Sequence, residues 1–111
     1  MAKHLNDKAY QAHIVAAGIR IARYIKTKTL SQFRKDEMLQ AAVVRELQII
    51  GEAAKRLSSA FKSHYPNIPW RDITGMRDVA VHDYFLLDLP GVWNTVKSDV
   101  PELLNKLKDK K

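Results

Sequence analysis

Five side chains able to do chemistry stand within eight positions of this chain, from Arg77 to Tyr84. They supply one guanidinium, one imidazole, two carboxylates and one phenol, from Arg77, His82, Asp78, Asp83 and Tyr84. An Arg presents a planar fork that can bind a phosphate at two points. A His titrates near neutral pH and can therefore move a proton in either direction. These residue types point to chemistry on a phosphate ester.

Arg77 and His82 together suggest cleavage of a phosphodiester without a metal ion. The imidazole would exchange a proton with the attacking or leaving oxygen, while the guanidinium neutralises charge on phosphorus. RNA supplies its own nucleophile, the 2′-hydroxyl beside each phosphate, so no protein nucleophile is needed. The alternative is structural: a helix end at which Arg77 bonds to a carboxylate on a facing helix and His82 pairs with Asp78. The residues alone leave both interpretations open.

A regular helix would place Arg77 in the middle of an apolar face, where an unpaired charge is costly. Its neighbours within about 60° would be Trp70, Ile73, Ala80, Val81 and Tyr84. His82 would fall about 140° away, beside Asp78. We therefore expect the helix to end or distort between Val81 and Tyr84, unless His82 acts from the rim of a cleft.

The sequence predicts that the elements which position these residues are helices. Apolar residues recur at helical spacing from Leu5 to about Lys26, and again from Ser31 or Asp36 to Ser63. A break at 65–69 precedes a third helix from Trp70 to about Tyr84, and Asp88 is a candidate cap for a fourth, which Pro101 would break or kink. The sequence therefore predicts an all-α bundle of four to five helices with short loops.

Two neighbouring residues of the second helix bear on the site. Gly51 costs about 1 kcal/mol relative to Ala in a helix interior, which suggests close approach by another helix. Glu52 has Lys55 and Arg56 three and four residues later, so a surface ion pair is its first interpretation.

Length and composition narrow the class of protein. A chain of 111 residues predicts a single domain, residues 1–111. The absence of Cys excludes a disulfide, a thiolate nucleophile and a zinc ribbon, and fits a cytoplasmic protein. We expect no membrane span, since no apolar run approaches the roughly 20 residues required, and the N-terminus lacks the pattern of a signal peptide. The four His share no metal-ligand spacing and there is no glycine-rich phosphate loop, so neither metal nor cofactor is expected.

The net charge of +7 is concentrated in the first third of the chain. Residues 1–35 hold eight Lys and Arg against one Asp, whereas the acids and bases balance in the remainder. Such a basic zone suits an anionic partner such as RNA. It is also typical of a solvated face whose cations favour the end of the first helix. Charge alone does not choose between the two.

Three stretches resemble a known family. Ile49–Ser58, Ile68–Phe85 and Leu89–Leu104 are similar to the HepT-like branch of the HEPN superfamily. The core motif of that family, Arg-x4-His-x-Tyr, falls on Arg77, His82 and Tyr84.

The resemblance implies an up-and-down HEPN bundle that forms a homodimer and acts as a metal-independent endoribonuclease. Arg77 and His82 would be its catalytic residues, on the dimer-contact face, so that two Arg/His sets would line one cleft across the two-fold axis. Glu52 matches an acidic residue common on the family's second helix and would support them. So would Asp78, which stands where the family most often has Asn and adds a negative charge.

By the same resemblance the chain would be the toxin of a type VII toxin–antitoxin pair. Its partner would be a nucleotidyltransferase antitoxin of the MntA type, which neutralises the toxin by transferring AMP to the motif tyrosine, here Tyr84. The alternative is a non-catalytic subunit that holds a nucleotide or presents a substrate to the nucleotidyltransferase.

Overall fold

The computed structural model describes residues 6–80 and 88–109, and within these ranges the chain is helical with no strand. The all-α prediction is therefore confirmed. The elements in chain order are α1 (Asp7–Ile25), α2 (Leu30–Lys35), α3 (Glu37–Arg56), α4 (Ser59–Ser63), α5 (Trp70–Gly75), the 3₁₀ helix η1 (Met76–Ala80), α6 (Leu89–Asn94), the π-helical segment η3 (Thr95–Asp99) and α7 (Val100–Asp109). No helix in the described ranges is long and apolar enough to cross a membrane.

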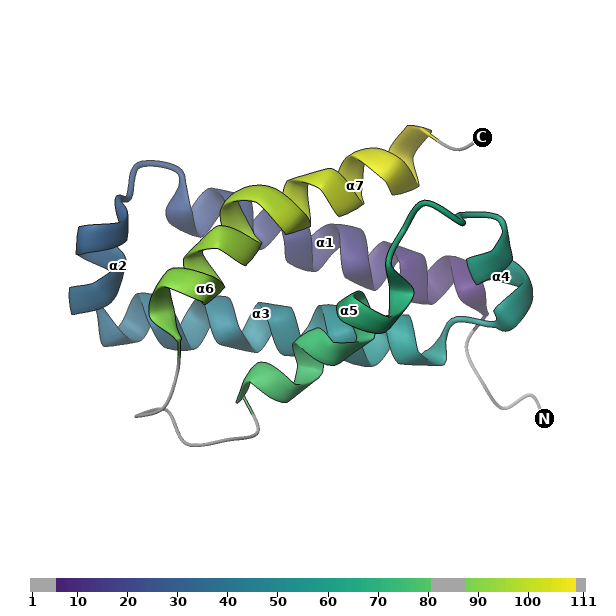
Figure 1. Ribbon diagram of the computed structural model, residues 1–111, viewed down its shortest axis with the longest axis horizontal. Coiled ribbons are helices and arrows are strands. Elements are labelled where there is room, and N and C mark those ends of the chain that lie inside the picture. The colour runs from purple at the N-terminus through teal and green to yellow at the C-terminus, as the bar shows by residue number, and fades with distance from the viewer. Residues whose placement is uncertain (1–5, 81–87, 110–111) are drawn as a thin grey trace.

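α1 and α3 lie side by side and antiparallel along the length of the molecule (Figure 1). At one end the Asp7 carboxylate accepts hydrogen bonds from the backbone N–H and the hydroxyl of Ser58, at 2.8 and 2.7 Å. Further along, Arg20 Nη2 lies 2.9 Å from the buried Glu46 carboxylate, to which the Tyr24 hydroxyl donates at 3.1 Å. These polar contacts fix how α1 is aligned along α3.

The apolar stripes of α1 and α3 form the centre of the core. Their fully buried members are Ile14, Ala17, Ile21, Val43, Leu47, Ile50 and Ala54, which follow the three- and four-residue spacing of the sequence. The first helix was predicted from Leu5 to Lys26 and is observed from Asp7, with the Asn6 side chain accepting from Ala9 N–H as its cap. The periodicity therefore located this element well.

The single long second helix that we predicted is wrong, because caps at Asp36 and Ser58 divide the segment into α2, α3 and α4. Thr29 and Gln32 form a reciprocal capping box that starts α2. The Asp36 side chain then accepts from Leu39 N–H and starts α3, and Ser58 accepts from Phe61 N–H and starts α4. Side chains that satisfy the free N–H groups of a helix start let the chain turn at each point.

The third helix also differs from the prediction. Its α-helical part ends at Gly75, and the chain continues as the tighter 3₁₀ helix η1 through Ala80. The helix therefore changes geometry before Arg77, which the sequence did not predict. The stretch from Val81 to Tyr84, where the distortion was expected, lies outside the described residues.

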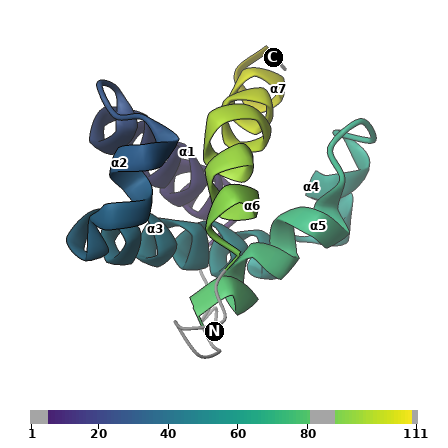
Figure 2. The same cartoon turned by 60° about the vertical axis from the view of Figure 1, so that its left-hand side comes forward.

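The C-terminal segment remains helical through Pro101. Asp88 caps α6 as predicted, with its carboxylate accepting from Gly91 N–H at 3.0 Å. Figure 2 shows α6, η3 and α7 as one continuous run, while α5 lies beside α3. The π-helical segment η3 occupies Thr95–Asp99 and ends two residues before Pro101. Pro101 removes one backbone N–H donor, so the departure from α geometry falls where it was expected, without a break.

Gly51 allows η1 to lie directly against α3. A Cβ atom at position 51 would overlap the backbone N of Arg77, and would lie 2.7 Å from Arg77 Cβ and 2.8 Å from the Thr74 carbonyl oxygen. No described glycine has a positive φ, so the contribution of Gly51 is the missing side chain. The close approach predicted at this glycine is confirmed, and its partner is the backbone that carries Arg77.

We expect Gly51→Ala to lower the free energy of unfolding by about 1–3 kcal/mol, because the added methyl forces α3 and η1 apart. Gly75→Ala is the matched control: a Cβ there meets nothing within 4 Å, and the change should be neutral or stabilising by up to about 1 kcal/mol. Urea unfolding of both variants measures the difference. Equal stability of the two variants would contradict the close packing at Gly51.

Candidate active site

Arg77 and Glu52 form the centre of the site. Arg77 Nη1 donates to Glu52 Oε2 at 3.0 Å, from η1 to α3. Glu52 is the residue after Gly51, so the position that lets η1 approach α3 also places a carboxylate beside the guanidinium. Glu52 Oε1 lies 3.7 Å from Arg56 Nη2, one helical turn further on. The carboxylate therefore contacts two guanidinium groups from two elements.

The guanidinium of Arg77 remains open to solvent. Its side chain is 36% exposed, which contradicts a position inside the monomer core. The Asp78 carboxylate, 60% exposed, lies 3.7 Å from Arg77 Nε, too far for a good hydrogen bond. A guanidinium carries five N–H donors. Within residues 6–80 and 88–109, Glu52 alone accepts a hydrogen bond from Arg77, which leaves donors for an anion.

The ion pair lowers the pKa of Glu52 below its ordinary value of 4.5. The main cause is the hydrogen bond from Arg77; desolvation comes second and opposes it, and the positive charges of Arg77, Arg56 and Lys55 add to the lowering. Because the pKa is lower in the folded chain, the pair contributes to stability above pH 4.5, and this contribution is lost as the pH falls through the folded-state pKa.

The structure thus brings together three of the five residues predicted for the site: Arg77, Glu52 and Asp78. His82 and Tyr84 lie outside the described residues, as does the predicted contact of His82 with Asp78. The structural alternative for Arg77, a bond to a carboxylate on a facing helix, is observed in the pair with Glu52. This pairing is compatible with both interpretations, since a partly exposed Arg held at one Nη atom keeps other donors.

Part of the basic first third of the chain has a structural use. Arg20 is paired with the buried Glu46, and this interaction raises the pKa of Arg20. By contrast, Arg23, Lys26, Lys28, Arg34 and Lys35 are exposed.

A groove beside Glu52 was not predicted. Tyr10 and His13 of α1 face Arg45, Gln48, Ile49, Glu52, Ala53 and Arg56 of α3 across a hollow of about 460 Å³. The available signal was the seven- and four-residue spacing of Arg45, Glu52 and Arg56, which puts all three on one face of a helix.

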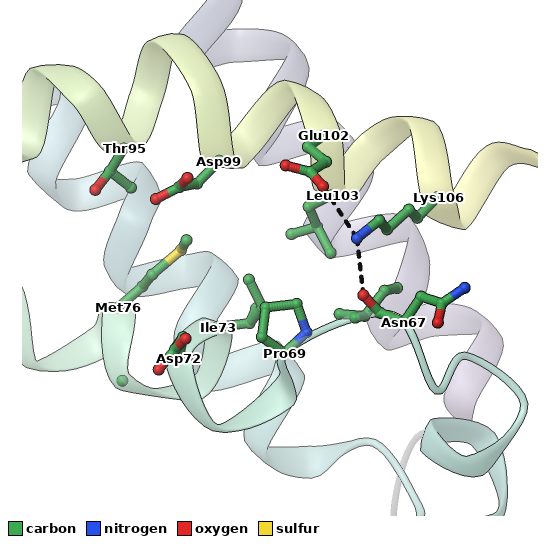
Figure 3. Close-up of a pocket in the computed structure, with 12 residues that line it drawn as sticks. Asn67, Pro69, Asp72, Ile73, Met76, Thr95, Asp99, Glu102, Leu103 and Lys106 are labelled. Carbon is green, nitrogen blue, oxygen red and sulfur yellow. Dashed lines mark hydrogen bonds and ion pairs between the residues drawn. The ribbon is translucent and has the colours of Figure 1, made fainter.

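A second hollow, of about 540 Å³, lies between α5 with η1 and η3 with α7 (Figure 3). Asp72, Asp99 and Glu102 line it, and Lys106 closes one end by donating to the Asn67 carbonyl at 2.7 Å and pairing with Glu102 at 3.1 Å. Three carboxylates against one ammonium disfavour a polyanion there. This hollow is therefore a poor candidate for RNA.

The described ranges contain no group of three or more His, Asp or Glu side chains arranged to hold a metal ion. The absence of a metal requirement stays a prediction.

Comparisons with known proteins identify the family. Residues 14–109 match the model of the family described as ribonuclease HepT-like. The chain is 40% identical over 101 residues to "Probable ribonuclease HepT" of Thermococcus cleftensis, covering 91% of this chain and 92% of that protein. It is 35% identical over 102 residues to "Putative RNase TTE0752" of Caldanaerobacter subterraneus subsp. tengcongensis, covering 92% and 91%.

A third relative is longer. "Gamma-glutamylcyclotransferase and putative RNase MJ0434" of Methanocaldococcus jannaschii is 40% identical over 100 residues, which are 90% of this chain but 45% of that protein. No solved structure matches the chain with comparable significance. The family match and these relatives place the chain among the ribonucleases. It belongs to the ribonuclease HepT-like family, as the motif around Arg77 predicted.

Carbon-detected NMR titration of the Glu carboxyl groups tests the pair of Glu52 with Arg77. We expect Glu52 to titrate below 4.5 in the native chain and to move up towards 4.5 in Arg77→Gln. Lys55→Gln, which removes a more distant charge, should move it much less. A Glu52 pKa that does not respond to Arg77→Gln would show that the ion pair is not formed in solution.

Proposed function

We propose that this protein is a metal-independent endoribonuclease that cleaves RNA through attack of the 2′-hydroxyl on the adjacent phosphate. The supporting observation is the Arg77 guanidinium, held at one Nη atom by Glu52 and 36% exposed, so that other donors are available to a phosphate. The three relatives named as ribonucleases support the same activity.

In this mechanism Arg77 binds the scissile phosphate and neutralises the charge that develops on its oxygens. The 2′-oxygen forms a bond to phosphorus as the bond to the 5′-oxygen breaks, which leaves a 2′,3′-cyclic phosphate and a 5′-hydroxyl. His82 would take the proton from the 2′-hydroxyl or give one to the leaving 5′-oxygen. Glu52 orients Arg77, and Asp78 places a negative charge near the phosphate that would weaken its binding.

We further propose that the chain works in the cytoplasm as a homodimer whose two Arg/His sets line one cleft. It would be the toxin of a type VII pair, neutralised by a nucleotidyltransferase antitoxin of the MntA type. The Tyr84 hydroxyl would attack the α-phosphorus of ATP, lose its proton and release pyrophosphate. The resulting AMP would block the cleft by its bulk and negative charge. The family membership supports this assignment.

A second candidate function is a non-catalytic subunit that binds a nucleotide or RNA for a nucleotidyltransferase. Two contacts favour it: Arg77 already has a carboxylate partner in Glu52, and Asp78 adds a second negative charge nearby. Such a subunit would bind RNA without cutting it.

Purified protein should cleave single-stranded RNA in the presence of EDTA and leave 2′,3′-cyclic phosphate ends. We expect Arg77→Ala and His82→Ala each to lower the rate by at least about 100-fold, the usual size of a lost electrostatic or acid–base contribution. Arg71→Ala, an exposed Arg on α5, is the control and should retain activity. Activity that survives in the Arg77→Ala/His82→Ala double variant would rule the mechanism out, and RNA binding without cleavage by the native chain would favour the second candidate.

Incubation with a nucleotidyltransferase of the MntA type and ATP should add the mass of AMP to the peptide that contains Tyr84 and stop RNA cleavage. Tyr84→Phe should escape both effects because it lacks the acceptor oxygen, whereas Tyr65→Phe should not. Intact-protein and peptide mass spectrometry measure the modification. Transfer of AMP to Tyr84→Phe at the native rate would exclude this tyrosine as the acceptor.

A further inference from the structure

The groove between α1 and α3 begins beside the ion pair of Arg77 and Glu52. Glu52, the partner of Arg77, is also one of the residues that line the groove. Arg56 lies on the same side and contacts the other oxygen of that carboxylate. Arg45 lines the groove eleven residues before Arg56, which on a helix is about three turns, or about 16 Å, along the same face. The groove therefore runs from the Arg77 site along α3.

The charges of the groove suit an anionic strand. Arg45 and Arg56 are exposed cations, and Glu52 is the one carboxylate among the residues that line it. That carboxylate is already shared between Arg56 and Arg77 at 3.7 and 3.0 Å. Counting the three Arg side chains against Glu52, this surface keeps a positive excess, whereas the hollow of Figure 3 has an acidic excess.

The floor of the groove suits a nucleobase. Ile49 and the buried Ala53 supply apolar surface, and Tyr10 is partly buried at the edge. The rings of Tyr10 and His13 meet edge to face, with centroids 6.1 Å apart, so α1 presents an aromatic wall opposite the cations of α3. Single-stranded nucleic acid is bound by this combination: cations along the backbone and aromatic or apolar surfaces against the bases.

We propose that this groove binds the single-stranded part of the RNA that flanks the scissile phosphate. Arg45 and Arg56 contact backbone phosphates, and the wall formed by Tyr10 and His13 packs against a base over Ile49. The proposal deepens the proposed function, on which it rests, by assigning a substrate-binding surface outside the catalytic pair. These groove residues bind RNA and do not touch the reacting atoms.

Removal of both groove cations should separate binding from chemistry. The experiment compares Arg45→Gln/Arg56→Gln with the matched pair Arg34→Gln/Arg71→Gln, which removes two exposed Arg from α2 and α5. The probe is a fluorescein-labelled, uncleavable 2′-O-methyl RNA of about twelve nucleotides, within the usual range for a single-strand site. We expect the groove variant to bind at least about tenfold more weakly, with a slope of log K against log salt reduced by about 1.4 for two lost phosphate contacts.

The chemical step is followed with the dinucleotide UpA, which is too short to occupy the groove. In the groove variant, kcat/KM for the cleavable long RNA should fall at least about tenfold further than kcat/KM for UpA, because only the long RNA loses the groove contacts. Equal loss of affinity in the two double variants would overturn the proposal, since it would show a general charge effect. An equal loss of UpA cleavage in the groove variant would also overturn it, by showing that these Arg act through the catalytic pair.

The groove and the proposed function can fail separately. Native protein whose RNA binding depends on Arg45 and Arg56 but which cleaves neither RNA would refute the ribonuclease mechanism and uphold the groove.

Discussion

The burial of one apolar stripe of α3 against α1 is the interaction on which the rest of the structure depends. Val43, Leu47 and Ile50 are completely buried along it, and the buried Glu46 is held by Arg20 and Tyr24. A buried carboxylate without partners would be strongly destabilising, so this contact also fixes how α1 is aligned. Once α3 is fixed in this way, its remaining faces place the other contacts described above: Gly51 meets η1, Glu52 meets Arg77, and Arg45 and Arg56 line the groove.

The position of Arg77 follows from packing more than from charge. Its pair with Glu52 is exposed by about two fifths on each side, and exposed ion pairs contribute little to stability. The contact between the backbone of η1 and Gly51, by contrast, leaves no room for a single methyl group. The backbone contact thus places η1, and the carboxylate of Glu52 orients the guanidinium within the space that remains. This division of roles explains how a site with little burial can still have a defined geometry.

Sequence reasoning located the elements better than their ends. Helical periodicity located α1 and α3 because the spacing of apolar residues within a helix does not depend on which residue caps it. It did not separate α2, α3 and α4, because Asp36 and Ser58 interrupt a pattern that looks continuous in apolar residues alone. Gly51 correctly predicted a close approach by another helix. Its partner could not be predicted, because a contact between residues 26 positions apart depends on the lengths and directions of α5 and η1. For the same reason the predicted ion-pair partners of Glu52 were Lys55 and Arg56: sequence spacing identifies neighbours one helical turn away, but not a partner on another element such as Arg77.

The contact at Gly51 also separates two kinds of information in related sequences. The atoms of Arg77 closest to position 51 are its backbone N and its Cβ. Every residue other than glycine and proline has the same two atoms in the same form. A relative that has lost the guanidinium would therefore still need a glycine at position 51 in order to fold this way. Glycine at position 51 reports that this packing is preserved, whereas arginine at position 77 bears on the proposed chemistry. A homologue with the glycine and without the arginine would keep the fold and lack the proposed phosphate-binding guanidinium.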